Sequence, residues 1–135
     1  MAISKGMHNG MKMASILLID DDDQFRAMLT EILTDAGHQV QAVTDGSQAT
    51  RVYVRHQTDL VITDLVMPNK DGVEVILELK RLNAAAKIIA MSGGGRHGSE
   101  SYLKVAHALG AQRVLAKPFS REELLEAVRR SLDGT

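Results

Sequence analysis

The sequence predicts an α/β fold in which a five-stranded parallel sheet carries helices on both faces. Short apolar runs alternate with longer segments of helical period from Ser15 onward, which is the pattern of repeated strand–helix units. The runs are continuously apolar, as in strands that helices cover on both sides. A length of 135 residues, 44% of them hydrophobic, suits one domain with a single core, and the absence of cysteine excludes disulfides and thiolate chemistry.

The five apolar runs are the predicted strands. The first reads Ile-Leu-Leu-Ile and offers no polar side chain to solvent, as expected inside a sheet with two covered faces. In chain order the runs are Ile16–Ile19, Gln39–Val43, Leu60–Thr63, Lys87–Met91 and Arg113–Ala116.

A helix is predicted after each strand. In the clearest one, apolar residues recur three or four positions apart from Phe25 to Ala36, and Gly37 predicts a left-handed stop. Weaker periodicity predicts four more helices. They cover about 46–56, 72–82, 99–109 and 120–132.

The last predicted helix has its own start signal. Ser120 precedes Glu123 by three positions, which is the spacing of a capping box, and Glu126 and Arg130 lie one helical turn apart. Only Asp133-Gly134-Thr135 follows this helix, so we expect no output domain in this chain.

Residues 1–14 predict a disordered tail ahead of a folded domain at 15–132. The segment lacks the continuous apolar stretch of a signal peptide, and the chain has no run of about 18 apolar residues that could span a membrane. We therefore expect a cytoplasmic protein. The formal net charge of −1 provides no overall basic field, so nucleic acid is not an expected partner.

Four consecutive aspartates, Asp20–Asp23, follow the first strand directly. Asp22 or Asp23 can cap the next helix, but capping does not account for all four. Asp20 and Asp21 lie at a strand end, where open α/β sheets bind ligands, and carboxylates this close repel one another unless a cation joins them. Hard oxygen ligands suit Mg²⁺ or Mn²⁺. A calcium loop of the EF-hand type is disfavoured because Phe25 stands where its sharp turn needs glycine.

A third aspartate, Asp64, ends the third strand. A carboxylate at the end of a buried strand is costly unless something binds it, whereas the Pro, Asn and Asp-Gly that follow make a loop. In a sheet of strand order 2-1-3-4-5 the first and third strands are neighbours, so Asp64 would face Asp20 and Asp21. We therefore expect three carboxylates to converge on one cation.

The last two strands end in polar residues at the same edge of the sheet. The fourth ends in Ser92, and the fifth runs into Lys117-Pro118-Phe119. Taken alone, Ser92 is typical of a turn and Lys117 of a solvated surface. Their coincidence with three acids at neighbouring strand ends instead predicts a site with one hydroxyl and one ammonium.

Together these residues resemble the receiver domain of two-component response regulators over nearly all of residues 15–132. The resemblance implies a flavodoxin-like, doubly wound sheet of order 2-1-3-4-5 and a role in phosphorelay signalling. It implies a sensor histidine kinase or histidine phosphotransfer protein as phosphodonor. The matching segments are Asp20-Asp21, Asp64, Met67-Pro68-Asn69-Lys70-Asp71-Gly72, Ser92 and Lys117-Pro118-Phe119.

The resemblance assigns the acids and one backbone group. Asp64 would be the phosphoacceptor. Asp20, Asp21, Asp64 and the backbone carbonyl of Val66 would hold Mg²⁺ or Mn²⁺. The domain would then signal by non-covalent binding to a downstream protein, without enzymatic activity beyond its own phosphorylation and dephosphorylation.

The resemblance also assigns the polar residues of the last two strand ends. Lys117 would contact the phosphoryl oxygens, and Ser92 would hydrogen-bond one of them after phosphorylation. The family has a cis peptide bond before the proline at Pro118.

One position departs from the family pattern, and two others bear on the lifetime of the phosphoryl group. Val114 stands where the family usually has a tyrosine or phenylalanine whose rotamer reports phosphorylation, so the signal would pass through the backbone or through Tyr102. Val66 and Gly94 occupy positions that influence dephosphorylation in the family. Because neither side chain can position water, the sequence predicts a long-lived phosphoryl group.

Rival interpretations have weaker support. Residues 93–98 satisfy G-x-G-x-x-G, the dinucleotide-binding pattern, but they follow the fourth strand rather than the first. A magnesium-dependent phosphatase of haloacid dehalogenase type also uses a strand-end aspartate, but it needs a second aspartate where Val66 stands. The five histidines are dispersed without metal-ligand spacing, so we expect surface or loop positions for all of them.

Overall fold

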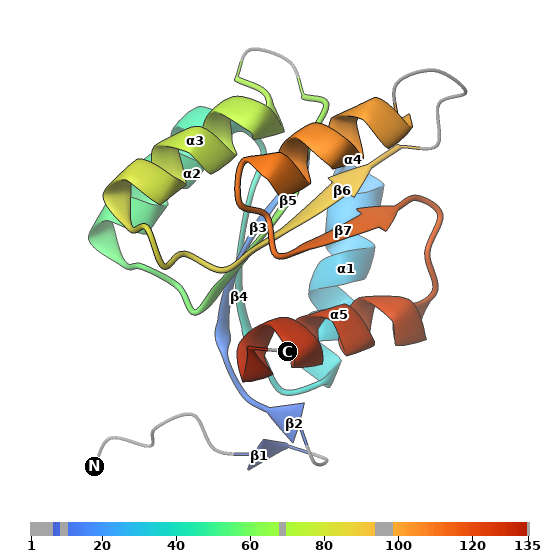
Figure 1. The fold of residues 1–135 in the computed structure, drawn as a ribbon. Helices are drawn as coiled ribbons and strands as arrows, with labels where there is room; N and C mark the ends of the chain where they lie inside the picture. The colour runs from blue at the N-terminus through green and yellow to red at the C-terminus, as the bar shows by residue number, and fades with distance from the viewer. Residues whose placement is uncertain (1–6, 9–10, 68–69, 94–98, 135) are drawn as a thin grey trace.

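The protein folds around a five-stranded parallel sheet in the computed structural model, which describes residues 7–8, 11–67, 70–93 and 99–134 (Figure 1). The strand order is β4-β3-β5-β6-β7, which is 2-1-3-4-5 along the chain, and every pair in this sheet is parallel. The predicted fold class and strand order are therefore confirmed. The strands are β3 (Ser15–Ile19), β4 (Gln39–Val43), β5 (Leu60–Asp64), β6 (Ile88–Ser92) and β7 (Arg113–Ala116).

Five helices cover the two faces of the sheet (Figure 1). Side chains of β3 alternate between the faces, because successive residues of a strand point to opposite sides. Leu17 packs with the buried residues of α2, α3 and α4, whereas Leu18 packs with those of α1 and α5. The helices are α1 (Asp23–Asp35), α2 (Gly46–Arg55), α3 (Gly72–Leu82), α4 (Ser99–Ala108) and α5 (Arg121–Asp133).

Two strands end in a polar residue directly after their apolar run, as the sequence predicted. β5 includes Asp64, which pairs with Met91, and β6 includes Ser92, which pairs with Ala116. The ladder continues because its bonds join backbone groups, whatever the polarity of the side chain. Both polar residues are thus held by the rigid sheet rather than by the loops that follow it.

The helix ends follow the predicted signals. Asp22 caps α1 by accepting a hydrogen bond from the amide of Phe25, and Gly37 adopts a φ of 98° just after the helix. Ser120 and Glu123 form the predicted capping box of α5. These caps fix where α1 and α5 begin, and so fix both helices relative to the strand ends before them.

The N-terminal segment contains two short strands where the sequence predicted only a tail. β1 (Met7–His8) and β2 (Met11–Lys12) pair in antiparallel fashion. Ala14, next to β3, is buried, and its amide donates to Nδ1 of His38 at 3.1 Å. The expectation of a surface position is therefore wrong for His38, which is 3% exposed. Its ring accepts a backbone hydrogen bond that the sheet leaves unmade.

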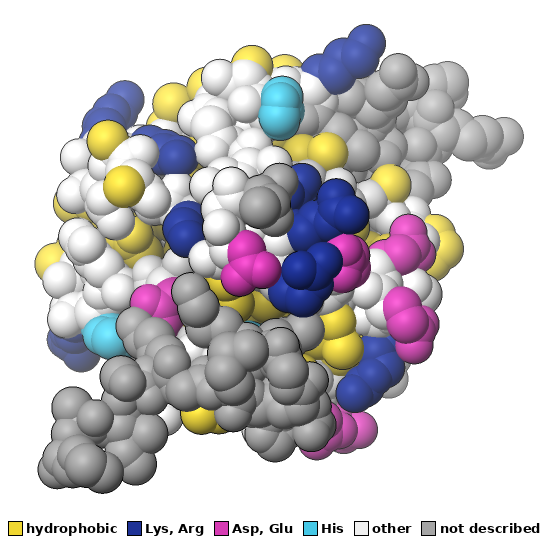
Figure 2. All heavy atoms as spheres, turned by 60° about the horizontal axis from the view of Figure 1, so that its bottom comes forward, with side chains coloured by type: hydrophobic (Ala, Val, Ile, Leu, Met, Phe, Trp, Pro, Cys, Tyr) yellow, Lys and Arg dark blue, Asp and Glu magenta, His cyan; other side chains and the backbone are white. Residues whose placement is uncertain are grey.

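Charged side chains of both signs lie side by side on the face at the bottom of Figure 1, which Figure 2 turns toward the viewer. On α5, Glu126 lies 2.8 Å from Arg130, as the spacing predicted, and it also lies 2.6 Å from Arg129. Among the described residues, no helix combines the length and the apolar character needed to cross a bilayer.

Candidate functional site

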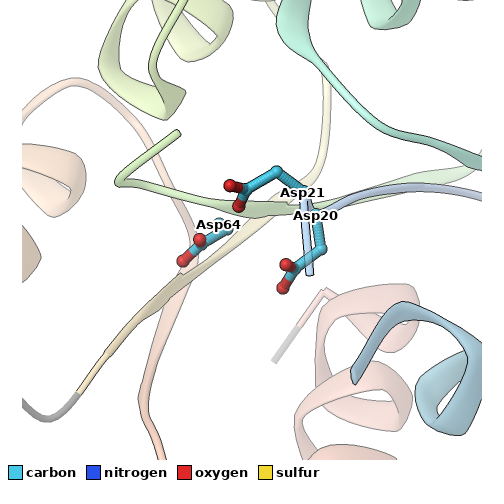
Figure 3. Close-up of side chains that lie close together, drawn as sticks. All are labelled: Asp20, Asp21 and Asp64. Atoms are coloured by element: carbon cyan, nitrogen blue, oxygen red, sulfur yellow. The ribbon is translucent and has the colours of Figure 1, made fainter. Parts of the chain in front are cut away.

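The carboxyl ends of β3 and β5 bring three aspartates together. Asp20 and Asp21 follow β3, Asp64 is the last residue of β5, and these strands are neighbours in the sheet. One carboxylate oxygen from each residue lies within 4.8 Å of the other two (Figure 3). The structure thus produces the convergence that the sequence predicted, and its cause is the strand order.

Asp20 is fully buried and well supplied with donors. The amide of Asp22 donates to its Oδ1 at 2.8 Å, and Nζ of Lys117 donates to its Oδ2 at 3.0 Å. The carbonyl of Asp20 accepts a bond from the guanidinium of Arg26 at 2.9 Å. Asp20 is therefore fixed by groups from α1 and from the segment after β7, while Asp21 beside it is exposed to solvent.

Asp64 is buried without the same support. Its Oδ1 has no hydrogen-bond donor, and Nζ of Lys117 lies 3.5 Å away, close enough for an ion pair but not for a directed hydrogen bond. Burial raises the pKa of Asp64 to about 6; Lys117 opposes the rise, and the charges of Asp20 and Asp21 add to it. A bound cation would stabilise this buried carboxylate, which lies beside two other acids. Hard oxygen donors of this kind fit Mg²⁺ or Mn²⁺.

Lys117 and Ser92 lie at the ends of adjacent strands. The amide of Lys117 donates to the carbonyl of Ser92 at 2.8 Å, which ties the end of β7 to the end of β6. The Ser92 hydroxyl is buried and donates to the carbonyl of Gly93 at 3.4 Å. Lys117 therefore already contacts the acids, whereas the Ser92 hydroxyl is engaged with its own loop. The peptide bond before Pro118 is cis.

The loop after Asp64 is anchored by backbone bonds on both sides. The amide of Leu65 donates to Met91 in β6, and the amide of Gly72 donates back to the carbonyl of Leu65, each at 2.9 Å. Between these anchors Met67 is buried and the side chain of Val66 is 53% exposed. Val66, two residues after Asp64, therefore lies in a loop that is tied to β6 at its start and to the first residue of α3 at its end.

Some residues named from the sequence lie beyond the described part of the chain, including residues 94–98 of the G-x-G-x-x-G segment. Pro68, Asn69 and Gly94 fall in the gaps, and so does the side chain of Tyr102. Val114 is described: it is partly buried and packs against the core on the α2–α4 side of the sheet.

Sequence reasoning missed the importance of Gly72 and Phe25 for the site. A methyl group on Gly72 would lie 2.3 Å from the carbonyl oxygen of Asp64 and 2.6 Å from Cα of Leu65. The pair Asp71-Gly72 predicted a turn, but it gave no sign that Gly72 packs against the backbone of Asp64 and Leu65. Phe25 was recognised only as part of the apolar face of α1, and its ring also lies 4.2 Å from Nζ of Lys117.

The fold and the site together define a class of protein: an open, doubly wound α/β domain with an acidic site and a lysine at its switch point. The family model of the response regulator receiver domain matches residues 16–129, and the chain belongs to this family.

Individual relatives agree with this assignment. The chain is 36% identical over 119 residues to the chemotaxis protein CheY of Bacillus subtilis, a match that covers 87% of this chain and 97% of CheY. It is 30% identical over 117 residues to sporulation initiation phosphotransferase F of the same organism, covering 87% and 92%. The match to the DNA-binding transcriptional regulator NtrC of Azospirillum brasilense, 37% identical over 124 residues, covers 92% of this chain but only 25% of NtrC.

Solved structures lead to the same fold. The receiver domain of NtrX from Brucella abortus superposes with a TM-score of 0.83 at 26% identity, covering 89% of this chain and 99% of that domain. A putative response regulator from Chloroflexus aurantiacus gives 0.82 at 28% identity, covering 89% and 98%. The chain is thus a phosphoacceptor signalling domain of two-component systems, and the phosphatase of haloacid dehalogenase type is not supported.

Proposed function

We propose that Asp64 is the residue that accepts the phosphoryl group, from a sensor histidine kinase or a histidine phosphotransfer protein. The observation that carries this assignment is the buried Oδ1 of Asp64, which lacks a donor at a strand end beside Asp20, Asp21 and Lys117. A carboxylate that attacks phosphorus has to lie near positive charge that can offset the charge of the incoming phosphoryl group.

Asp20, Asp21, Asp64 and the backbone carbonyl of Val66 are the groups that would hold Mg²⁺ or Mn²⁺. The three carboxylates supply hard oxygen ligands within reach of one ion. A bound divalent cation supplies positive charge that neutralises the phosphoryl oxygens during transfer.

The residues of the chain itself carry out the transfer step. A carboxylate oxygen of Asp64 forms a bond to phosphorus while the bond from phosphorus to the donor's imidazole nitrogen breaks. The nitrogen keeps the electron pair and takes up a proton, and the product is an acyl phosphate. Lys117, which already lies between Asp20 and Asp64, pairs with a phosphoryl oxygen. The Ser92 hydroxyl gives up its hydrogen bond to the carbonyl of Gly93 and donates to a second phosphoryl oxygen.

The added charge then changes which protein the domain binds. An acyl phosphate carries about one more negative charge than the carboxylate, enough to draw donors such as Ser92 and to shift a two-state surface. With Val114 in place of an aromatic switch, the change passes through the backbone of β6 and β7. We place this exchange in the cytoplasm, with residues 15–132 as the acting unit and 1–14 as a tail. We assign it no nucleic-acid partner and no activity beyond its own phosphorylation and dephosphorylation.

Intact-mass measurement after incubation with Mg²⁺ and a small phosphodonor tests the proposal. We expect one phosphoryl adduct per chain, lost in Asp64→Asn and kept in Asp35→Asn, a matched change at an exposed aspartate of α1. An adduct that persists in Asp64→Asn would refute the assignment. Repeated turnover of the donor without a lasting adduct would favour a phosphatase instead.

A further inference from the structure

Aromatic residues are scarce in this chain, and two of the four lie together beside the site. The protein has two phenylalanines, two tyrosines and no tryptophan. Phe25, from the first turn of α1, and Phe119, two residues after Lys117, meet with ring centroids 5.7 Å apart and planes inclined by 76°. This edge-to-face contact fixes the orientation of the Phe25 ring.

The ring of Phe25 contacts the ammonium group of Lys117. Nζ lies 4.2 Å from the ring centroid, well inside the range of a cation–π interaction. The same ammonium lies 3.0 Å from Oδ2 of Asp20 and 3.5 Å from Oδ1 of Asp64, and the Lys117 side chain is 19% exposed. The ammonium therefore has an aromatic ring as a neighbour in addition to two carboxylates.

Phe25 is itself held in place by bonds between α1 and the end of β3. Its amide donates to the capping carboxylate of Asp22 at 3.0 Å, and the amide of Asp22 donates to Asp20 at 2.8 Å. The next residue, Arg26, donates to the Asp20 carbonyl. The first turn of α1 is thus tied to Asp20, which Lys117 also contacts. The position of the Phe25 ring is therefore fixed relative to the site.

We propose that Phe25 is a positioning residue for Lys117: its ring holds the ammonium between Asp20 and Asp64 before the phosphoryl group arrives. A lysine has a flexible four-carbon stem. Its ammonium stabilises the charge of the phosphoryl group best when it is already in position and does not have to be ordered during the reaction. The inference rests on the proposed function, because it assumes that Lys117 contacts the transferred group.

A series of fluorinated phenylalanines at position 25 separates the electrostatics of the ring from its bulk. Each fluorine weakens the negative ring face while leaving the shape nearly unchanged. We expect the maximal rate of phosphorylation by a small phosphodonor to fall stepwise, by about three- to tenfold for the most fluorinated ring. Phe25→Tyr keeps the electron-rich ring face and should keep the rate of the unmodified chain. Phe25→Leu has no ring face and should be as slow as the most fluorinated ring.

Two further measurements distinguish positioning from packing. The Mg²⁺ concentration for half-maximal rate should stay unchanged across the series, because the ring contacts the ammonium and not the carboxylates that would hold the cation. In a Lys117→Gln background the fluorine dependence should vanish, since the cation is gone. Met28→Leu, at an exposed position of α1, is the matched control and should leave every value unchanged.

The possible failures can be told apart. A flat fluorine series, with normal phosphorylation of the unmodified chain, would overturn this inference and leave the proposed function standing. A fluorine series that persists in Lys117→Gln would also overturn it. An unmodified chain that takes up no phosphoryl group would refute the proposed function, and this inference with it.

Discussion

Asp64 is the residue at which stability and reactivity oppose each other. Its carboxylate is buried, one oxygen has no donor, and its pKa is raised to about 6 chiefly by burial. A group with such a pKa destabilises the folded chain whenever it is ionised. Asp20 is also buried, but its carboxylate accepts two hydrogen bonds, whereas Oδ1 of Asp64 accepts none. This difference is why we propose Asp64, rather than Asp20, as the reacting acid.

Replacing Asp64 with asparagine should stabilise the metal-free protein at neutral pH but not in acid. Between pH 3.8 and about 6 the unfolded chain releases this proton before the folded chain does, so rising pH favours unfolding. The full cost, up to about 3 kcal/mol, is present above pH 6 and disappears below 3.8. Urea unfolding of both proteins at pH 4 and pH 7.5, without divalent cations, measures the difference. An advantage of Asp64→Asn that is equal at both pH values would contradict this account.

Val66 should set the lifetime of the phosphoryl group. Its side chain is exposed two residues after Asp64, and a valine cannot position a water molecule for hydrolysis. We expect the purified phosphoprotein to persist well beyond seconds, and Val66→Asn to shorten its lifetime roughly tenfold, equal to about 1.4 kcal/mol of barrier. Intact-mass time courses check both. Decay of the unmodified protein within seconds would contradict the prediction.

At the scale of elements, the loop from β5 to α3 connects Asp64 to the helices. Nζ of Lys70 lies 2.5 Å from Oε1 of Glu78 in α3, and the Thr50 hydroxyl of α2 donates to the same oxygen at 2.9 Å. The hydrogen bond from Lys70 holds the pKa of Glu78 below its usual range. The start of α3 packs still more tightly, since Gly72 touches the backbone of Asp64. A change at this helix end therefore reaches Asp64 directly.

Gly72→Ala should damage both stability and phosphorylation. The new methyl group would meet backbone atoms, which cannot move aside as a flexible side chain can, so we expect a loss of about 1 to 3 kcal/mol. Gly93→Ala is the matched control, because a methyl group there meets nothing within 4 Å. Denaturant unfolding and the phosphorylation rate measure the two effects. A Gly72→Ala protein as stable and as reactive as Gly93→Ala would contradict the close approach.

On the scale of the whole molecule, a nearly neutral chain contains a local excess of negative charge. The formal net charge is −1, yet three carboxylates meet at one edge of the sheet with Lys117 as the ammonium between two of them. The rest of the fold maintains this repulsion, because the strand ends that carry the acids are set by two packed cores. A cation that binds the folded chain but not the unfolded chain should therefore raise the free energy of unfolding.

Mg²⁺ should stabilise the protein against unfolding, by about 2.7 kcal/mol at a hundredfold excess over its dissociation constant. Asp21→Asn should lose most of this gain while changing the metal-free stability little, because Asp21 is exposed. Thermal unfolding across a Mg²⁺ titration at constant ionic strength gives both values, and Asp35→Asn should keep the full gain. An equal gain in Asp21→Asn would remove Asp21 from the ligand set.

The sequence by itself determined the elements, their order and most of the site. Apolar runs and helical periodicity are local properties, so the helices, the strands of the parallel sheet and the cap at Ser120 could be predicted within a residue or two, and the cap of α1 could be narrowed to Asp22 or Asp23. The convergence of Asp20, Asp21 and Asp64 followed once the strand order was assumed, because parallel strands end at one edge.

Only the tertiary structure decided which side chains meet across that edge. Lys117 and Asp20 are 97 positions apart, and their bond depends on how α1 and β7 pack against the ends of β3 and β6. The same holds for the ring of Phe25 over Lys117, the approach of Gly72 to Asp64 and the burial of His38. Such contacts arise from the packing of whole elements, which no local pattern encodes.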